Sequence, residues 1–197
     1  MGVDKAEMRL GGRTLLEIAV GKLGAIADEV VVVGQRESVA GGARVIRDLR
    51  PGCGPMGGVE AALRDARQGA AVFVPVDMPL VPAGLLGKMV GAWVESGSSV
   101  CLCVADGRVQ PLLSLLRAEV LAEVQMRLDR GEYKMQPMLE AAGGSRLVET
   151  EISTTERGSV WPGWGPRDAE WAARGSWFAN LNTPEEFREA ERCADAL

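Results

Sequence analysis

Two aspartates follow apolar segments of the sequence, and their positions point to metal and phosphate chemistry. Asp48 comes directly after residues 43–47, and Asp77 comes directly after the apolar residues 71–76. A carboxylate at the end of a buried strand is costly unless it is paired. Mg²⁺ is a natural partner because it takes one or two carboxylates and leaves coordination sites open for phosphates. Either aspartate could instead cap a turn; for Asp77 we favour the functional interpretation, because Pro79 stiffens the loop that presents it.

Three further segments have residue types that suit an anionic or heterocyclic ligand. Residues 51–58 form a glycine- and proline-rich loop ahead of a helix, where backbone can approach a ligand and the helix start favours anions. Such a loop is also common as a plain connection between a strand and a helix. Asn180 and Asn182 lie two residues apart, so both amides share one side of an extended segment, although Asn182 could simply initiate the next helix. Lys5 alone is typical of an ordinary solvated lysine.

The composition excludes several classes of function. The 197 residues contain no histidine, which excludes Ser-His-Asp and Cys-His catalysis and every metal site that needs a histidine. With 22 lysines and arginines against 27 aspartates and glutamates, the formal net charge is −5. The resulting pI near 5.0 argues against non-specific nucleic-acid binding, which needs a basic surface.

The cysteines and the apolar runs indicate a cytoplasmic protein. Cys101 and Cys103 form a lone CxC pair, which we interpret as two residues on one face of a buried strand; the alternative is a redox or metal site. No apolar run reaches the roughly 18 residues of a transmembrane helix. The first residues also lack the apolar core of a signal peptide.

The apolar pattern alternates between helical and strand-like periods along one domain. Helices are predicted over residues 14–26, 57–66, 82–95, 118–128, 134–142 and 184–194, and strands over residues 30–33, 43–47, 71–76, 99–104, 109–116, 146–152 and 177–181. Asp106 and Gly107 mark a hairpin between two of these strands. The alternation predicts an α/β fold in which helices cover both faces of a mostly parallel sheet. In such a sheet, ligands bind at the carboxyl ends of the strands.

Taken together in chain order, five segments resemble the molybdenum cofactor guanylyltransferase (MobA) family. They are residues 1–5, residues 47–48 together with 54–58, residues 75–79, residues 110–112 and residues 180–186. The first and the last are the most discriminating, and the match runs over nearly the whole chain. The resemblance implies a Rossmann-like nucleotidyltransferase fold. It also implies an enzyme that transfers GMP from GTP to the phosphate of molybdenum-bound molybdopterin, releasing pyrophosphate and forming the molybdopterin guanine dinucleotide cofactor.

The resemblance also implies roles for individual residues. Lys5 and Asp77 match the catalytic pair: Lys5 contacts the nucleotide phosphates, Asp77 holds Mg²⁺, and Asp48 binds the nucleotide. Gly54 and Pro55 match the nucleotide loop, and the molybdopterin contacts match Gly57, Gly58, Gln110, Lys134, Asn180 and Asn182. Implied partners are GTP, molybdenum-bound molybdopterin, and molybdoenzymes or their chaperones, with no nucleic acid and no membrane.

The sequence departs from the family pattern at three places. One is Val33, near which the family commonly has an asparagine that contacts the nucleotide. A strand and a glycine-rich stretch precede the segment that matches Met1, so we expect about 10–15 residues of the domain to lie upstream. Residues 158–176, rich in glycine, proline and tryptophan, look like an inserted loop, either packed on its own aromatics or acting as a lid over the pterin.

Two other functions remain open at this point. The first is a nucleotidyltransferase with another substrate pair, either molybdopterin with CTP or a sugar phosphate. The second is a catalytically inactive protein that binds the cofactor and delivers it to a molybdoenzyme.

Overall fold

The computed structural model describes residues 4–36, 39–144, 147–152, 173–194 and 197. The expectations about Met1 and about most of the insertion at 158–176 fall outside these residues. Within the described ranges, no helix is both long enough and apolar enough to cross a bilayer.

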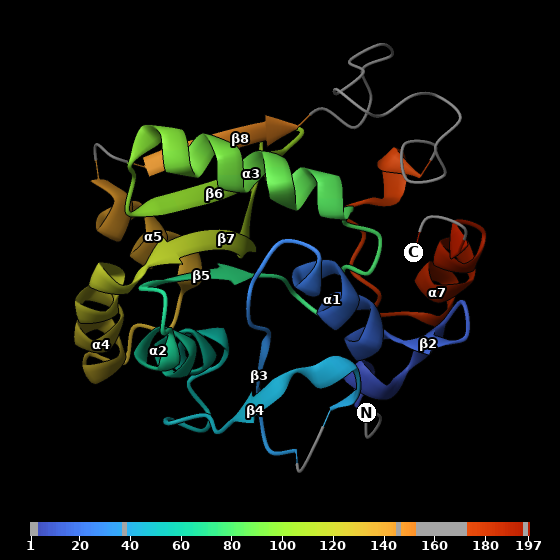
Figure 1. Ribbon diagram of the computed structural model, residues 1–197, viewed down its shortest axis with the longest axis horizontal. Helices are drawn as coiled ribbons and strands as arrows, with labels where there is room; N and C mark the ends of the chain where they lie inside the picture. The colour runs from blue at the N-terminus through green and yellow to red at the C-terminus, as the bar shows by residue number, and fades with distance from the viewer. Residues whose placement is uncertain (1–3, 37–38, 145–146, 153–172, 195–196) are drawn as a thin grey trace.

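A four-stranded mixed sheet forms the centre of the molecule (Figure 1). It consists of β5 (Ala70–Phe73), β6 (Val100–Ala105), β7 (Arg108–Arg117) and β8 (Leu147–Ile152), in the order β5-β7-β6-β8. Strand β7 is antiparallel to both of its neighbours, whereas β8 is parallel to β6. The hairpin predicted between β6 and β7 is confirmed, and this hairpin is the reason that the pairing there is antiparallel.

Two smaller strand pairs lie beside this sheet. Strands β3 (Val31–Val33) and β4 (Arg44–Ile46) pair in parallel. Strands β1 (Arg9–Leu10) and β2 (Arg13–Thr14) form an antiparallel pair that the sequence pattern does not predict. The α/β class is therefore confirmed. A mostly parallel sheet is not confirmed, because the described strands mix parallel and antiparallel pairs.

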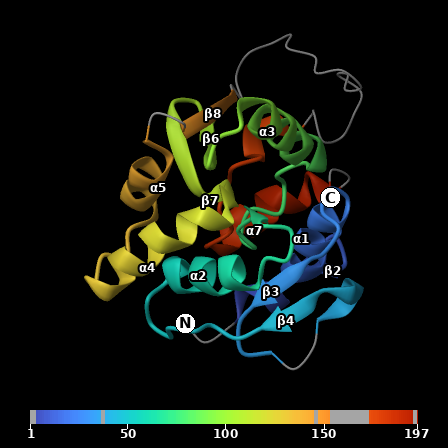
Figure 2. The same cartoon turned by 60° about the vertical axis from the view of Figure 1, so that its left-hand side comes forward.

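Helices cover both faces of the central sheet, as predicted. The α-helices of the described residues are α1 (Leu15–Gly24), α2 (Pro55–Asp65), α3 (Ala83–Ser96), α4 (Leu121–Asp129), α5 (Met135–Gly143) and α7 (Pro184–Glu191). Helix α3 lies over one face, and α2, α4 and α5 lie toward the other (Figures 1 and 2).

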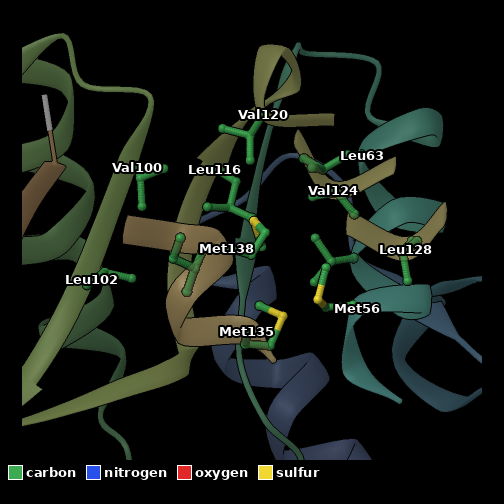
Figure 3. Packing of buried hydrophobic residues seen from close by; sticks show 12 residues of the cluster. Met56, Leu63, Val100, Leu102, Leu116, Val120, Val124, Leu128, Met135 and Met138 are labelled. Carbon is green, nitrogen blue, oxygen red and sulfur yellow. The ribbon is translucent and has the colours of Figure 1, made fainter. Parts of the chain in front are cut away.

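Alternate residues of β6 point into two different cores. Cys101 and Cys103 pack with α3, while Val100 and Leu102 pack with α2, α4 and α5 (Figure 3). This is the period-two alternation of a strand buried on both faces. It confirms that the CxC pair belongs to the core, where burial raises the pKa of the Cys103 thiol to about 12.

The strand predicted over residues 177–181 is wrong. A 3-10 turn, η5 (Arg174–Ser176), leads into this segment, and no strand forms there. Its apolar residues instead serve two separate cores, since Trp177 packs under α3 and Leu181 packs near α1. The alternating apolar pattern therefore arises because apolar residues of one irregular segment pack into two different cores.

Candidate active site

Three side chains from distant parts of the chain meet just beyond the carboxyl end of β5. Lys5, on the 3-10 turn η1 (Lys5–Glu7), has its Nζ 3.5 Å from Oδ2 of Asp77. The same Nζ donates a hydrogen bond to Oδ1 of Asn182. The Lys5 and Asp77 side chains are 35% and 26% exposed, so a ligand can reach both. The sequence singled out each residue separately, and the structure brings the three together as a lysine–aspartate–asparagine cluster.

Arg36 holds the turn that carries Lys5. Its guanidinium forms ion pairs with Asp4 and Glu7, the residues that flank Lys5, and Asp4 also caps the turn by accepting from the Ala6 N–H at 3.0 Å. The sequence pattern does not indicate this role. Arg36 lies just past the carboxyl end of β3, so the strand-end rule that identified Asp48 and Asp77 could have found it.

The loop that carries Asp77 is fixed on two sides. The Leu181 N–H donates to the Asp77 carbonyl at 2.9 Å, which ties this loop to the segment bearing Asn182. Pro79 lies two residues after Asp77, and its carbonyl accepts a hydrogen bond from the buried Lys22 of α1. The Asp77 carboxylate is thus presented by a loop with little freedom to move.

A capping box at the start of α7 fixes the backbone at Asn182. The Glu186 carboxylate accepts from the N–H groups of Asn182 and Thr183, each at 2.7 Å, and Thr183 Oγ1 accepts from the Glu186 N–H. These backbone donors hold the pKa of the Glu186 carboxyl below its ordinary value of 4.5. The Thr-x-x-Glu spacing, which also occurs at Thr14 and Glu17, could have identified Glu186 in the sequence.

We expect Glu186→Gln to weaken both the fold and the cluster. A carboxyl group whose pKa is lowered by folding stabilises the protein at pH values above its unfolded-state pKa. This contribution disappears as the pH falls through the folded-state pKa. The variant should therefore melt at a lower temperature than the parent at pH 7, and the gap should narrow as the pH is lowered below the ordinary carboxyl pKa of 4.5. Thermal melts across this pH range measure the effect.

Glu17→Gln is the matched control. Glu17 completes the same capping box on α1, with its pKa lowered in the same way by the Thr14 N–H, and it lies outside the cluster. Both variants should lose stability with the same pH dependence, but Glu186→Gln alone should raise the substrate KM. Equal effects of the two variants on KM would show that Glu186 serves only the helix.

A second group gathers around Asp48, at the start of α2. Its Oδ1 accepts from the Arg50 N–H at 2.8 Å, which folds the loop back toward the helix. A Cβ on Gly57 would lie 2.8 Å from the Asp48 carboxylate and 3.0 Å from the Arg50 carbonyl. Gly54 precedes the helix with φ 60°, and Pro55 is the first helical residue. The aspartate and the predicted glycine-rich loop therefore form one unit.

A buried carboxylate holds this loop through an ion pair with Arg50. Glu60 of α2 is 1% exposed, and its Oε2 lies 2.9 Å from Nε of Arg50. Arg50 also binds Asp129 at 2.6 Å, and Gln125 donates to Glu60 at 3.1 Å. These contacts join α2 and α4 to the loop. The sequence does not predict these contacts, because a glutamate within a helical pattern gives no sign of burial.

We expect Gly57→Ala to displace Asp48 and to destabilise the protein. An added methyl group in so tight a contact costs about 1–3 kcal/mol, which exceeds the roughly 1 kcal/mol that alanine gains over glycine within a helix. Urea unfolding and nucleotide titration measure the two effects. The control is Gly91→Ala on α3, where a Cβ meets nothing within 4 Å and alanine should stabilise the protein. A Gly57→Ala variant as stable as the control and with unchanged nucleotide affinity would contradict the close contact.

The remaining predicted residues lie outside these two groups. Strand β7 is antiparallel to β5, and Ser114 of β7 pairs with Phe73, the last residue of β5. Gln110 precedes Ser114 on β7, so it lies beyond the carboxyl end of β5, as Asp77 does. Gly58 packs near Val33, and Asn180 is exposed two residues before Asn182. Lys134 is exposed directly ahead of α5. Among the described residues, no hydrogen bond or ion pair joins the side chains of Gln110, Lys134 and Asn180 to the lysine–aspartate–asparagine cluster. The Asn180 backbone carbonyl does accept a hydrogen bond from Asn182 Nδ2 at 3.4 Å.

Comparison with known proteins places the chain in a family. The model of the MobA-like NTP transferase domain matches residues 1–147. A molybdenum cofactor guanylyltransferase of Cereibacter sphaeroides (strain ATCC 17029) is 31% identical over 196 residues, covering 96% of this chain and 88% of that protein. The chain belongs to the molybdenum cofactor guanylyltransferase family. The family suggested by the sequence motifs is thereby confirmed.

Other members of this family and related structures match over similar lengths. The Sinorhizobium fredii molybdenum cofactor guanylyltransferase is 28% identical and covers all of this chain. The crystal structure of molybdopterin-guanine dinucleotide biosynthesis protein A from Archaeoglobus fulgidus superposes with a TM-score of 0.75 at 24% identity, covering 100% of this chain and 93% of that one. The 2-C-methyl-D-erythritol 4-phosphate cytidylyltransferase of Thermus thermophilus gives 0.66 at 19% identity, covering 96% and 93%. These structures share the nucleotidyltransferase fold.

Proposed function

We propose that this guanylyltransferase-family protein transfers GMP from GTP to the phosphate of molybdenum-bound molybdopterin, forming the guanine dinucleotide cofactor and releasing pyrophosphate. The observation that carries the proposal is the cluster of Lys5, Asp77 and Asn182 at the carboxyl end of β5. This is the sheet edge where α/β folds bind their ligands.

The cluster suits a reaction that depends on charge neutralisation more than on proton transfer. An oxygen of the molybdopterin phosphate bonds to the α-phosphorus of GTP, and the bond to the pyrophosphate oxygen breaks. The attacking group is already an anion, so no general base is needed, and a chain without histidine can carry out this chemistry. Lys5 would place its ammonium against the phosphates, with Asn182 holding the side chain in that direction.

The donor set at Asp77 fits a magnesium ion shared with a substrate. Mg²⁺ typically takes one or two carboxylates and fills its remaining positions with water and phosphate oxygens. Asp77 is one partly exposed carboxylate, and no group of three candidate ligands gathers elsewhere among the described residues. The bound ion would supply positive charge to the phosphate oxygens. Within the protein, Lys5 would exchange its contact with Asp77 for a contact with phosphate.

The Asp48 group would form the nucleotide half of the site. The start of α2 favours an anion, and no side chain caps this helix end at Gly54, so it is open to a ligand. Asp48 can accept hydrogen bonds from a nucleoside. Gly57, Gly58, Gln110, Lys134 and Asn180 would then contact the pterin side. We place the reaction in the cytoplasm, with molybdoenzymes or their chaperones as recipients of the product.

Pyrophosphate release by the native protein tests this function. Protein purified from its own source is incubated with Mg²⁺, molybdenum-bound molybdopterin and either GTP or CTP. We expect turnover with GTP, and Lys5→Ala should suppress it. Turnover with CTP alone, or with a sugar phosphate in place of molybdopterin, would assign the protein to a different nucleotidyltransferase reaction. No turnover with either nucleotide would identify a cofactor-binding protein without catalysis.

A further inference from the structure

The loop between β4 and α2 is folded around the backbone of Arg50. The Arg50 N–H donates to Oδ1 of Asp48 at 2.8 Å, and its carbonyl accepts from the Cys53 N–H at 3.2 Å. The same carbonyl lies against Gly57, where an added Cβ would be 3.0 Å away from it. Both backbone groups of Arg50 are therefore used inside the loop, and one of them holds the Asp48 carboxylate.

The side chain of Arg50 leaves the loop and bridges two helices. Its Nε lies 2.9 Å from Oε2 of Glu60 on α2, and its Nη1 donates to Oδ1 of Asp129 on α4 at 2.6 Å. Helices α2 and α4 lie side by side in both views (Figures 1 and 2). A planar guanidinium binds two carboxylates at once from fixed directions, which the single ammonium group of a lysine does not do.

The two carboxylates differ in burial, and therefore in how firmly they hold Arg50. The Glu60 side chain is 1% exposed, whereas that of Asp129 is 67% exposed. An exposed ion pair contributes little because water competes for both charges, whereas a buried carboxylate that loses its cation is left uncompensated. Among the described residues, Arg50 is the only cation within ion-pair distance of Glu60. Glu60 therefore determines where the Arg50 side chain lies.

We propose that Arg50 is a positioning residue for the nucleotide, which acts through Asp48 and is itself held in place by Glu60. Its N–H occupies Oδ1 of Asp48 and fixes the plane of the carboxylate. Oδ2 is then the acceptor for a hydroxyl or N–H group of the nucleoside. A carboxylate that is already oriented loses little conformational freedom when the ligand binds, so it binds more tightly than a mobile one. This inference rests on the proposed role of Asp48 in nucleotide binding.

The location of Arg50 predicts an effect on binding rather than on the chemical step. Among the described residues, no hydrogen bond or ion pair connects Arg50 or Glu60 to the lysine–aspartate–asparagine cluster. Loss of the ion pair with Glu60 should therefore raise the KM for GTP and leave kcat at saturating GTP within a few-fold of the parent. A role in the chemical step would lower kcat instead.

Direct binding of a phosphate by Arg50 is the alternative, because its side chain is 33% exposed. The two interpretations predict opposite effects of the same substitution. If Arg50 bound phosphate itself, removal of a carboxylate that competes for its guanidinium would tighten nucleotide binding. If Arg50 acts through Asp48, removal of the Glu60 charge releases the Arg50 side chain and weakens nucleotide binding.

Calorimetric titration of the protein with GTP in the presence of Mg²⁺ tests the proposal. Glu60→Gln should raise the Kd for GTP about 10-fold or more, which is the usual effect of losing one well-oriented hydrogen bond to a charged group. Arg50→Gln should have the same effect, and Arg50→Lys, which keeps a cation for Glu60, should recover part of the loss. Unchanged or tighter GTP binding in Glu60→Gln would overturn the proposal.

Asp129→Asn and Asp65→Asn are the matched controls. Asp129 is the exposed partner of the same arginine, and Asp65 pairs with Arg44 at the other end of α2. Each substitution removes one carboxylate charge from an ion pair with arginine, and neither should change the Kd for GTP by more than about two-fold. If Asp65→Asn raised this Kd as much as Glu60→Gln does, Arg50 would serve only the stability of α2, and the proposal would be wrong.

Amide hydrogen exchange separates a failure of this inference from a failure of the proposed function, because it needs no ligand. In Glu60→Gln the Arg50 amide should lose protection, since its hydrogen bond to Asp48 is no longer held, while the Leu115 amide in the central sheet should be unchanged. An Arg50 amide that stays as protected as in the parent would overturn the positioning role, even in a protein that transfers GMP. A parent protein that binds no GTP would instead overturn the nucleotide role of Asp48 and the proposed function with it.

Discussion

Asp77→Asn lowers kcat for guanylyl transfer by about 100-fold or more while leaving the fold intact. The substitution keeps the size of the side chain and removes the negative charge that lies 3.5 Å from Lys5 Nζ. Asp77 would hold the Mg²⁺ that neutralises the reacting phosphates, and losing one preorganised electrostatic group of this kind typically costs about two to three orders of magnitude in kcat. The Leu181 N–H donates to the Asp77 backbone carbonyl, so the loop should keep its position. Steady-state kinetics at saturating GTP measure the loss.

The matched control is Asp28→Asn. Asp28 is exposed in the bend ahead of β3, at the opposite end of the strands from Asp77. The same exchange of carboxylate for amide there should leave kcat within a few-fold of the parent. If Asp77→Asn retained the activity of this control, Asp77 would have no part in the reaction.

Trp177→Ala lowers the free energy of unfolding by about 3–5 kcal/mol, the usual cost of removing a large aromatic side chain from a core. Trp177 is 1% exposed and packs under α3 against β6 and β7. Its ring meets Phe178 edge-on, with centroids 6.5 Å apart. Asn182 lies five residues after Trp177. The empty space that the substitution leaves should therefore also loosen the segment that bears this asparagine. Urea unfolding measures the stability loss.

The stability of Trp177→Phe shows whether the loss in Trp177→Ala comes from missing aromatic packing in the core or from a disturbed backbone in this segment. Phenylalanine keeps an aromatic ring in the core and should recover most of the stability. Val94→Ala, at a 64% exposed position of α3, should change stability by less than about 0.5 kcal/mol. A Trp177→Ala variant as stable as Val94→Ala would show that the tryptophan contributes little to the core.

Most helices and strands could be predicted because each is encoded locally. The capping boxes at Thr14 and Thr183 and the hairpin turn at Asp106 act within four residues, and the structure contains all three. Sheet order is not local in this way. The mixture of parallel and antiparallel pairs depends on which strands meet. The irregular segment from residue 177 has the apolar pattern of a strand because its apolar residues pack into two different cores.

The site could be predicted residue by residue but not as an arrangement. Residue type and place at strand ends identified Asp48 and Asp77, and family resemblance added Lys5. The partners that hold them could not be found in this way, because Arg36 is 32 residues from Asp4 in the chain and Lys22 is 57 residues from Pro79. Long-range ion pairs leave no periodic signal, so only the folded structure reveals them.

The most direct test of the guanylyltransferase proposal follows the α-phosphate of GTP. The native protein is incubated with molybdenum-bound molybdopterin and GTP labelled with ³²P at either the α or the γ position, and the pterin product is separated. Transfer of GMP predicts that the α label enters the product, while the γ label leaves as pyrophosphate. A product that carries the γ label, or one that carries neither label while GTP is consumed, would contradict the account.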